Sequence, residues 1–346
     1  MKAIDPATGL PEGTFAIATV DREGSPRPTL VKPDGSGVDV SDRFADTHAI
    51  FDDWERSLDA LEAIDAQVGV GDLDLQDARF LPPLARPNIL GAGANSRQHV
   101  AEQMTHIPDY PGRPRLEGES DEELFARNLE FVDRRKAHGL PVLFAVLHSA
   151  LIGADDDLVL PPVGVRHDWE LELGAVLASG GRFRTPRQAE GMVAGYTVIN
   201  DLATNENYAR PDIPWSVDFS PKSQQSFKPC GPFVVPAQFV DLADDMRITL
   251  EVNGETKQDW PVDDMIFSVG EYLSYASERF RLEPGDIVMM GSPPGNGSYH
   301  DQFLRPGDVV ESAITYLGRQ HNRCVEEVLE NGRPTWGLLA DRARVA

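Results

Sequence analysis

Two acidic side chains share one face of a predicted strand at residues 167–173. A strand turns its side chains alternately to opposite faces, so Glu170 and Glu172 point the same way. On an isolated strand, such a pair most often lies on a solvated outer face. The β-branched and aromatic run at 195–200 is typical of a protein interior, however, and it ends in a third acid, Asp201. We therefore expect the three carboxylates to converge.

Converging carboxylates need a positive charge beside them, because a lone buried carboxylate would cost roughly tens of kcal/mol by idealised Born solvation. Glu170, Glu172 and Asp201 would offer three oxygen ligands without a thiolate or a histidine cluster. Such a donor set suits a hard divalent ion that keeps positions open for water and substrate. The pattern predicts a magnesium (Mg²⁺) site, with Mn²⁺ and Ca²⁺ as alternative ions.

A histidine and a glutamate follow a short apolar strand and two glycines in the segment 88–103. His99 and Glu102 are three residues apart, so they lie on one face of the helical turn that we expect there. A histidine oriented by a carboxylate can act as a general base near neutral pH, although a surface pair is the alternative interpretation. Ser96 stands where the dinucleotide motif GxGxxG requires glycine, which disfavours a nucleotide site.

Two constrained turns carry further polar residues. The glycine-rich loop, residues 289–297 (MMGSPPGNG), contains three glycines and two prolines. Ser292 and Gly295 are the residues of this loop that we single out. Its backbone N–H groups and the Ser292 hydroxyl could face a bound oxygen atom. Lys222 and Ser226 precede a Gly-Pro turn at 231–232. An ordinary tight turn and a solvated lysine are the alternatives here.

The composition limits the class of protein that holds these residues. The chain has 346 residues, 41% hydrophobic and 25% charged, which excludes disorder, collagen and coiled coil. Its net charge of -24 would repel nucleic acid and an anionic membrane surface, so we expect neither as a partner. Cys230 and Cys324 lie in no CxxC spacing, and no apolar run is long enough to span a membrane. We expect a cytoplasmic protein.

The elements that position these residues predict an α+β, β-rich fold with a small N-terminal domain. The chain alternates strands and turns at 14–40, continues as a helix at 50–68 and is broken by prolines at 81–88, which suggests domains at 1–80 and 86–346. Capping boxes predict three later helices, and apolar alternation predicts four further strands. The caps are Ser120 with Glu123, Thr185 with Gln188 and Ser268 with Glu271; the strands lie at 169–176, 246–252, 286–291 and 309–317.

In order and spacing, these segments resemble the fumarylacetoacetate hydrolase superfamily over roughly residues 86–325. GAGANSRQHVAE is similar to the family's G-x-N-Y-x-x-H-x-x-E, HDWELE to its D-Y-E-x-E, and GYTVIND to its GYTxxND. PKSQQSFKPCGPFVV is similar to its K-S-F-D-x-F-x-P-x-G-P. The resemblance implies a mixed β-roll, usually a homodimer, that binds a divalent cation and acts on β-dicarbonyl or 2-oxo acids.

The resemblance also implies roles for individual residues. Glu170, Glu172 and Asp201 would be the metal ligands, and His99 and Glu102 the pair that activates water. Lys222 would support developing negative charge. The residues that would line the substrate are Ser226, Ser292 and Gly295.

Four positions depart from the family pattern, and one of them is Gln225, which stands where K-S-F-D has its aspartate. Asn205 and Tyr208 stand where members often carry Arg and Gln, and Val146 stands where they carry Lys. Arg and Lys usually hold a substrate carboxylate by charge-assisted hydrogen bonds, so these substrate-binding positions predict a less charged substrate. Replacement cations could come from Arg97, Arg210 or Lys228.

The function expected from residues and resemblance together is a divalent-metal-dependent hydrolase. It would cleave a C–C bond in a small-molecule β-dicarbonyl substrate, a 1,3-diketone or a diketo acid. A decarboxylase, hydratase or tautomerase that acts on a 2-oxo acid by the same enolate chemistry is the alternative. A metal-binding relative without activity is a third interpretation, which the retained His99 and Glu102 oppose.

Overall fold

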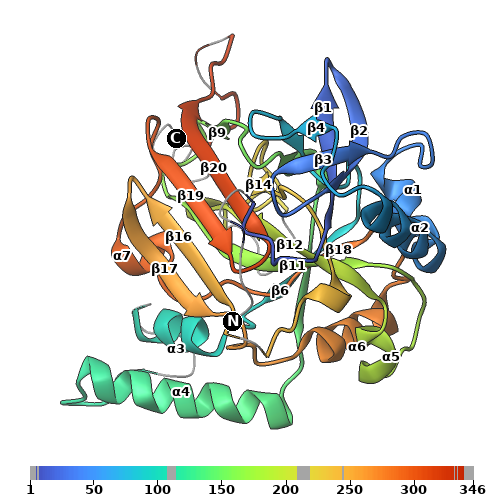
Figure 1. The fold of residues 1–346 in the computed structure, drawn as a ribbon. Coiled ribbons are helices and arrows are strands. Elements are labelled where there is room, and N and C mark those ends of the chain that lie inside the picture. Colours follow the sequence, from blue (N-terminus) through green and yellow to red (C-terminus); the bar gives the residue numbers. More distant parts are fainter. Residues whose placement is uncertain are drawn as a thin grey trace.

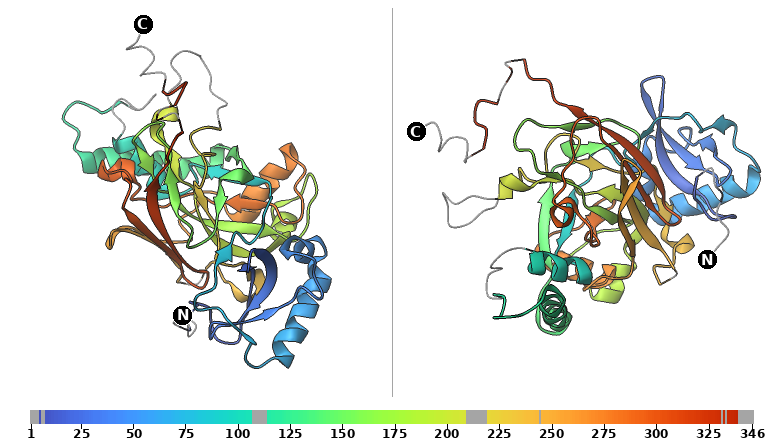
Figure 2. Two further views of the ribbon diagram at one scale, coloured as in Figure 1. Left: turned by 90° about the horizontal axis from the view of Figure 1, so that it is seen from above. Right: turned by 90° about the vertical axis from the view of Figure 1, so that its left-hand side faces the viewer.

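The N-terminal part of the chain is an antiparallel sheet covered by two helices. The computed structural model describes residues 5, 8–106, 114–208, 219–243, 245–330, 332 and 334–338. The sheet has the order β4-β3-β2-β1-β5, and it confirms the predicted meander. It lies to one side of the molecule in both views of Figure 2. Its strands are β1 (Ala16–Arg22), β2 (Ser25–Val31), β3 (Ser36–Asp39), β4 (Leu73–Asp74) and β5 (Phe80–Leu81).

The single helix predicted at 50–68 is two helices, α1 (Thr47–Asp52) and α2 (Trp54–Gln67). The break lies at Asp53, whose backbone leaves the helical region at φ -135° and ψ 64°. The apolar spacing continues across the break, so Ile50 and Phe51 are buried on the same side as Leu61. Burial of this shared face does not require a continuous helix, which is why periodicity alone missed the break.

The main sheet has six strands in the order β15-β12-β11-β18-β6-β7. Its two longest strands, β11 and β12, are buried at every residue and pair antiparallel, with Leu171 opposite Asn200. Burial on both faces explains their continuous apolar sequence. The strands are β6 (Ile89–Gly93), β7 (Val142–Val146), β11 (Leu171–Leu177), β12 (Val193–Asn200), β15 (Val235–Pro236) and β18 (Ile287–Met289).

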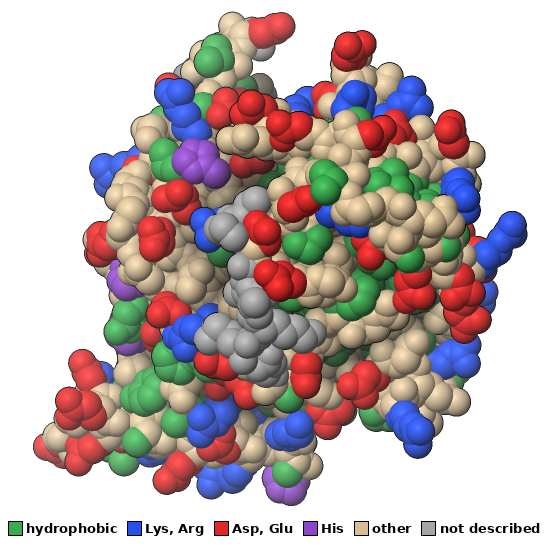
Figure 3. Space-filling model, in the orientation of Figure 1, with side chains coloured by type: hydrophobic (Ala, Val, Ile, Leu, Met, Phe, Trp, Pro, Cys, Tyr) green, Lys and Arg blue, Asp and Glu red, His purple; other side chains and the backbone are tan. Residues whose placement is uncertain are grey.

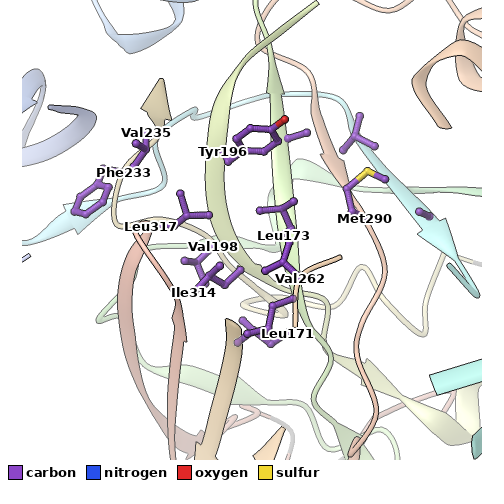
Figure 4. Close-up of a cluster of buried hydrophobic side chains, with 14 of the residues drawn as sticks. Leu171, Leu173, Tyr196, Val198, Phe233, Val235, Val262, Met290, Ile314 and Leu317 are labelled. Atoms are coloured by element: carbon purple, nitrogen blue, oxygen red, sulfur yellow. The ribbon is translucent and has the colours of Figure 1, made fainter. Parts of the chain in front are cut away.

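A second sheet packs on the main one, in the order β17-β16-β19-β20-β9. Leu171 and Val198 of the main sheet meet Ile314 and Leu317 in the core between them (Figure 4). The predicted hairpin at Asn253-Gly254 joins β16 to β17, with both residues at positive φ. The strands are β9 (Leu158–Leu160), β16 (Arg247–Val252), β17 (Glu255–Pro261), β19 (Val309–Ile314) and β20 (Gly318–Glu326).

Within the described residues, five further α-helices surround the sheets (Figure 1). The three predicted capping boxes are confirmed at the starts of α4, α5 and α6. These helices are α3 (Arg97–His106), α4 (Asp121–His138), α5 (Pro186–Glu190), α6 (Val269–Arg279) and α7 (Gly297–His300). Two short strand pairs complete the fold: β10 (His167–Asp168) with β13 (Ala203–Thr204), and β8 (Leu151–Ile152) with β14 (Lys228–Pro229).

The N-terminal sheet shares a hydrophobic core with the rest of the chain. Ile17 and Val234 exchange backbone hydrogen bonds of 2.9 and 2.8 Å across the junction. Phe15 and Leu30 belong to the same buried cluster as Ile287 of the main sheet. The strand-rich α+β fold class is confirmed, while the domain boundary at 81–88 stays a prediction.

The surface agrees with the acidic composition. Acidic side chains are spread over the face shown in Figure 3, with Lys and Arg side chains among them. No helix within the described residues is long and apolar enough to cross a membrane.

Candidate active site

Three carboxylates meet where β11 begins and β12 ends. Glu170 directly precedes β11, and Asp201 directly follows β12. The Asp201 N–H donates a 2.8 Å hydrogen bond to the Glu170 carbonyl, which fixes the two strand ends together. One carboxylate oxygen from each of Glu170, Glu172 and Asp201 lies within 4.8 Å of the others. These three residues, the carboxylate cluster, converge as predicted.

Two lysines lie against the carboxylate cluster. The Lys222 ammonium is 2.6 Å from Oε2 of Glu170, and it also donates to Asp201. The Lys228 ammonium is 2.9 Å from Oδ1 of Asp201, and both of these side chains are fully buried. Two ammonium groups beside three carboxylates leave negative charge uncompensated when all five groups are ionised, which favours one additional cation.

Burial and neighbouring charges shift the pKa values of these groups in opposite directions. Burial and the nearby Asp201 charge raise the pKa of Glu172 well above its ordinary value. For Glu170, burial raises the pKa, but the charge and hydrogen bond of Lys222, together with the attraction of other neighbours such as Lys228, outweigh burial and the pKa falls. Burial lowers the pKa of Lys228 to about 8. The two glutamates of one site therefore differ in proton affinity, and Glu172 is the weaker acid of the two.

The carboxylate cluster is a candidate site for a divalent metal ion. Three oxygen donors from carboxylates, two of them almost completely buried, form the hard ligand set that Mg²⁺ and Mn²⁺ prefer. An ion there would relieve the repulsion that raises the pKa of Glu172.

His99 and Glu102 both lie on α3, and His99 lines the same cavity as the carboxylate cluster. Nδ1 of His99 is 3.8 Å from Oε2 of Glu102, which is too long for a hydrogen bond. Glu102 is 8% exposed, and it accepts a 3.1 Å hydrogen bond from the Gly295 N–H. Nδ1 of His99 is buried without a hydrogen-bond partner among the described residues. The predicted pair is thus brought together in space.

The glycine-rich loop binds protein carboxylates through its backbone. The N–H of Gly291 donates to Oε2 of Glu172, that of Gly295 donates to Glu102, and that of Gly297 donates to Asp168. We expected these N–H groups to face a bound oxygen atom, and the three that bind carboxylates correct that prediction. Buried carboxylates need donors, and positive φ values at Gly291 and Gly295 let the loop supply them.

A cavity of about 770 Å³ opens over the carboxylate cluster. His99, Lys222, Tyr208 and Ser292 line it, as expected of site residues. Apolar side chains form its other wall, among them Met104, Leu143 and Phe144.

Phe144 connects the apolar wall to the charged one. Its ring centre lies 5.3 Å from the Lys222 ammonium, a cation–π distance. The ring covers Gly91 so closely that a Cβ atom on Gly91 would lie 2.0 Å from it. Gly91 therefore provides the space in which Phe144 reaches Lys222.

Other predicted substrate-binding residues are placed away from the cavity lining. Ser226 is 1% exposed, and its hydroxyl exchanges hydrogen bonds of 2.7 and 3.1 Å with the Val159 backbone. The Asn205 amide donates to Asp168 at 2.8 Å and to Ser298 at 2.7 Å. These polar groups bind the protein itself because burial requires internal partners.

Val146 and Gly295 also differ from expectation. Val146 is 6% exposed, packs in the core shared with the N-terminal sheet and is not among the cavity-lining residues. Gly295 contributes its N–H to Glu102 and is not among the cavity-lining residues.

Arg97 and Lys228, two of the three cations expected as replacements, are paired with protein carboxylates and do not line the described part of the cavity. Arg97 pairs with Asp133 of α4, and Lys228 is enclosed with Asp201. Arg210 lies outside the described residues.

Sequence reasoning missed two buried polar residues next to the site. Asp168 accepts hydrogen bonds from Gly297, Ser298 and Asn205, which ties the loop to β10. Gln258 of β17 contacts both β11 and the glycine-rich loop. Asp168 adjoins the two glutamates in sequence, which was an available signal. Gln258 lies on an ordinary hairpin strand and offered none.

The chain matches a family model at residues 88–325, described as the C-terminal domain of fumarylacetoacetate (FAA) hydrolase. A 2,4-didehydro-3-deoxy-L-rhamnonate hydrolase from Sphingomonas sp. (strain SKA58) is 36% identical over 189 residues, 54% of this chain and 65% of that protein. A mitochondrial oxaloacetate tautomerase from Bos taurus is 29% identical over 257 residues, 73% of this chain and 71% of that protein.

Solved structures share the fold. A fumarylacetoacetate hydrolase from the psychrophilic Exiguobacterium antarcticum superposes with a TM-score of 0.68 at 23% identity, covering 91% of this chain and 100% of that one. A maleylpyruvate hydrolase from Sphingobium sp. SYK-6, in complex with manganese(II) ion and pyruvate, gives a TM-score of 0.67 at 22% identity. That match covers 90% of this chain and 100% of the other.

Proposed function

Because this chain belongs to the fumarylacetoacetate hydrolase family, we propose that it is a divalent-metal-dependent enzyme that cleaves a C–C bond in a β-dicarbonyl substrate. The family includes hydrolases and tautomerases, as the names of its relatives indicate. The observation that carries the proposal is the carboxylate cluster at the cavity, with His99 and Lys222 lining the same space.

Glu170, Glu172 and Asp201 would hold the ion, Mg²⁺ first and Mn²⁺ or Ca²⁺ as alternatives. When bound, such an ion withdraws charge from a carbonyl that chelates it. The manganese(II) and pyruvate named for the maleylpyruvate hydrolase of the same fold support an ion and an oxo acid in this kind of site.

The protein's own groups would then move the proton. His99 accepts a proton from water as the water oxygen adds to one substrate carbonyl, the adjacent C–C bond then breaks, and the carbon that leaves takes the proton back from His99. Glu102 stabilises the charge that His99 holds in between, once the 3.8 Å separation shortens. The Gly295 N–H keeps the Glu102 carboxylate in place during this step. Lys222 and the Ser292 hydroxyl donate toward negative charge that develops on the substrate oxygen.

The cavity supports a substrate with an uncharged substituent. Met104, Leu143 and Phe144 form an apolar wall, and the Lys222 ammonium is already paired with Glu170. A distal carboxylate would meet no unpaired lysine or arginine among the described lining residues. We therefore expect a neutral 1,3-diketone, or a diketo acid with a neutral tail, to have a higher kcat/KM than an acylpyruvate with a second carboxylate. Equal or higher values for the dicarboxylate would contradict this preference.

Tautomerisation of a 2-oxo acid is the second candidate function. The Bos taurus relative is named an oxaloacetate tautomerase, and proton transfer by His99 could serve that reaction without an attacking water. Decarboxylation or hydration would use the same groups. Product analysis separates them, since hydrolysis gives two carbon fragments, decarboxylation gives CO₂, and tautomerisation or hydration keeps the carbon skeleton.

The experiment is turnover of dicarbonyl substrates by protein stripped with EDTA and then resupplied with Mg²⁺ or Mn²⁺. We expect activity to vanish on stripping and to return with the ion. Glu172→Gln should bind no ion and show no activity, whereas Glu311→Gln, an exposed glutamate on β19, should behave as wild type. Equal metal content in wild type and Glu172→Gln would contradict the proposal.

A further inference from the structure

Gln258 is a buried amide that joins three segments of the site. It lies on β17 and is 1% exposed. Its Oε1 accepts a 3.1 Å hydrogen bond from the Leu171 N–H, and its Nε2 donates to Oγ of Ser292 at 3.0 Å and to the Pro293 carbonyl at 2.9 Å. The amide therefore uses both its donor and its acceptor function inside the protein.

The two sides of this bridge converge on Glu172. On one side, Gln258 holds Leu171, which stands between the two glutamates of the carboxylate cluster. On the other side it holds Ser292, whose neighbour Gly291 donates its N–H to Oε2 of Glu172. A closed ring of covalent and hydrogen bonds thus passes through Gln258, β11, Glu172 and the glycine-rich loop.

We propose that Gln258 is a positioning residue for the metal site, which fixes the orientation of the Glu172 carboxylate without touching the ion. The proposal rests on the proposed function, because it assumes that the carboxylate cluster holds a divalent ion. The Gly291 N–H holds Oε2 of Glu172, so the loop fixes the carboxylate that would hold the ion. Partners that orient a metal ligand contribute measurably to affinity, and their loss typically weakens it about 10–100-fold.

Gln258 also determines the direction of the Ser292 hydroxyl. Because Nε2 of Gln258 donates to Oγ of Ser292, the serine must donate its own proton elsewhere. Its acceptor within the protein is the Pro293 carbonyl at a long 3.3 Å, and Ser292 lines the cavity. The hydroxyl is therefore a donor that a substrate oxygen can engage.

An amide is the side chain that can make this bridge. A carboxylate would set an acceptor against the Pro293 carbonyl, and an apolar chain would leave the Leu171 N–H without its partner. A buried N–H that loses its acceptor is destabilising, so a test must separate loss of stability from loss of metal binding.

The test compares Gln258→Met with a matched control, Gln320→Met. Gln320 of β20 is 2% exposed, and its Nε2 donates to two backbone carbonyls, those of Val198 and Gly231. Both variants lose backbone hydrogen bonds from a buried amide, so both should lower the thermal unfolding temperature. Mn²⁺ affinity is measured by calorimetric titration of the full chain, below both unfolding temperatures.

We expect Gln258→Met to bind Mn²⁺ at least about tenfold more weakly than wild type, and Gln320→Met to match wild type. Equal Mn²⁺ affinity in the two variants would overturn the positioning role while leaving the proposed function intact. Absence of Mn²⁺ binding by the wild type would instead overturn the proposed function. If Gln258→Met does not fold, Gln258→Asn replaces it, because the shorter side chain cannot reach both partners. We expect the same loss of Mn²⁺ affinity from Gln258→Asn, and an affinity equal to that of Gln320→Met would overturn the positioning role.

Discussion

The main-chain N–H of Gly295 donates a 3.1 Å hydrogen bond to Oε2 of Glu102. The same carboxylate oxygen lies 3.8 Å from Nδ1 of His99. One carboxylate therefore links the glycine-rich loop to the helix that carries the candidate base. A charge-assisted bond to a backbone N–H fixes the position of Glu102 before any substrate binds.

Glu102→Gln should separate proton transfer from metal binding. The amide keeps the size of the side chain, but it cannot stabilise a protonated His99, so we expect kcat to fall by about 10²–10⁴. Glu102 is not part of the carboxylate cluster, so Mn²⁺ affinity should stay near the wild-type value. Steady-state kinetics and Mn²⁺ titration measure the two effects. If Glu102→Gln lost Mn²⁺ affinity and activity together, Glu102 would have a structural role. Glu130→Gln, on α4, is the control for the loss of one negative charge.

Lys222→Met should lower kcat without weakening Mn²⁺ binding. The ammonium binds the carboxylates of Glu170 and Asp201, two of the three residues that would hold an ion, so its removal should leave Mn²⁺ affinity equal or higher. Loss of a donor toward developing negative charge should lower kcat by about 10²–10³. The same titration and kinetics test both statements. Weaker Mn²⁺ binding by this variant would mean that Lys222 organises the cluster instead of competing with the ion.

The local elements of this fold were accessible from sequence because their signals are local. Ser120, Thr185 and Ser268 each begin a helix with the predicted reciprocal cap, since a capping box is satisfied within four residues. The convergence of Glu172 and Asp201 was also predictable. Strand alternation placed Glu170 and Glu172 on one face, and the apolar run before Asp201 indicated a buried acid that needs a partner.

The direction of individual side chains in the site depended on tertiary structure. Val146 lies on a cavity strand, yet it faces the core that β7 shares with the N-terminal sheet, which only the sheet's position determines. The Asn205 amide donates its hydrogen bonds to Asp168 and Ser298, which are 37 and 93 positions away in the sequence. Gln258 reaches the site from another sheet, and no spacing in the sequence connects it to Leu171.

Gly91→Ala should disturb the apolar wall of the cavity. A Cβ atom there would lie 2.0 Å from the Phe144 ring, so the ring must move away from Lys222, at a cost of about 1–3 kcal/mol in the free energy of unfolding. We expect lower stability and lower kcat/KM. Denaturant unfolding and kinetics measure them, with Phe144→Leu added to the same chain as a rescue. Failure of the smaller side chain to restore stability would show that the Gly91 backbone, not Phe144, sets the requirement.

His167→Gln should remove part of the pH dependence of stability. His167 is 5% exposed, and burial lowers its pKa below the ordinary 6.5. Between these two pKa values the unfolded chain holds the proton and the folded chain does not, so the free energy of unfolding falls as pH falls. One proton limits this slope to about 1.4 kcal/mol per pH unit.

The measurement for His167 is urea unfolding of wild type and variant between pH 7.5 and 5.5, above the range in which ordinary carboxylates dominate. The Gln amide can still bond the Thr204 hydroxyl, which His167 contacts at 3.0 Å, so the variant should fold and lose less stability on acidification. His138→Gln, a change of an exposed histidine on α4, should keep the wild-type slope. Identical slopes for all three proteins would mean that His167 binds its proton equally well in the folded chain, and that burial at β10 does not discriminate against its charged form.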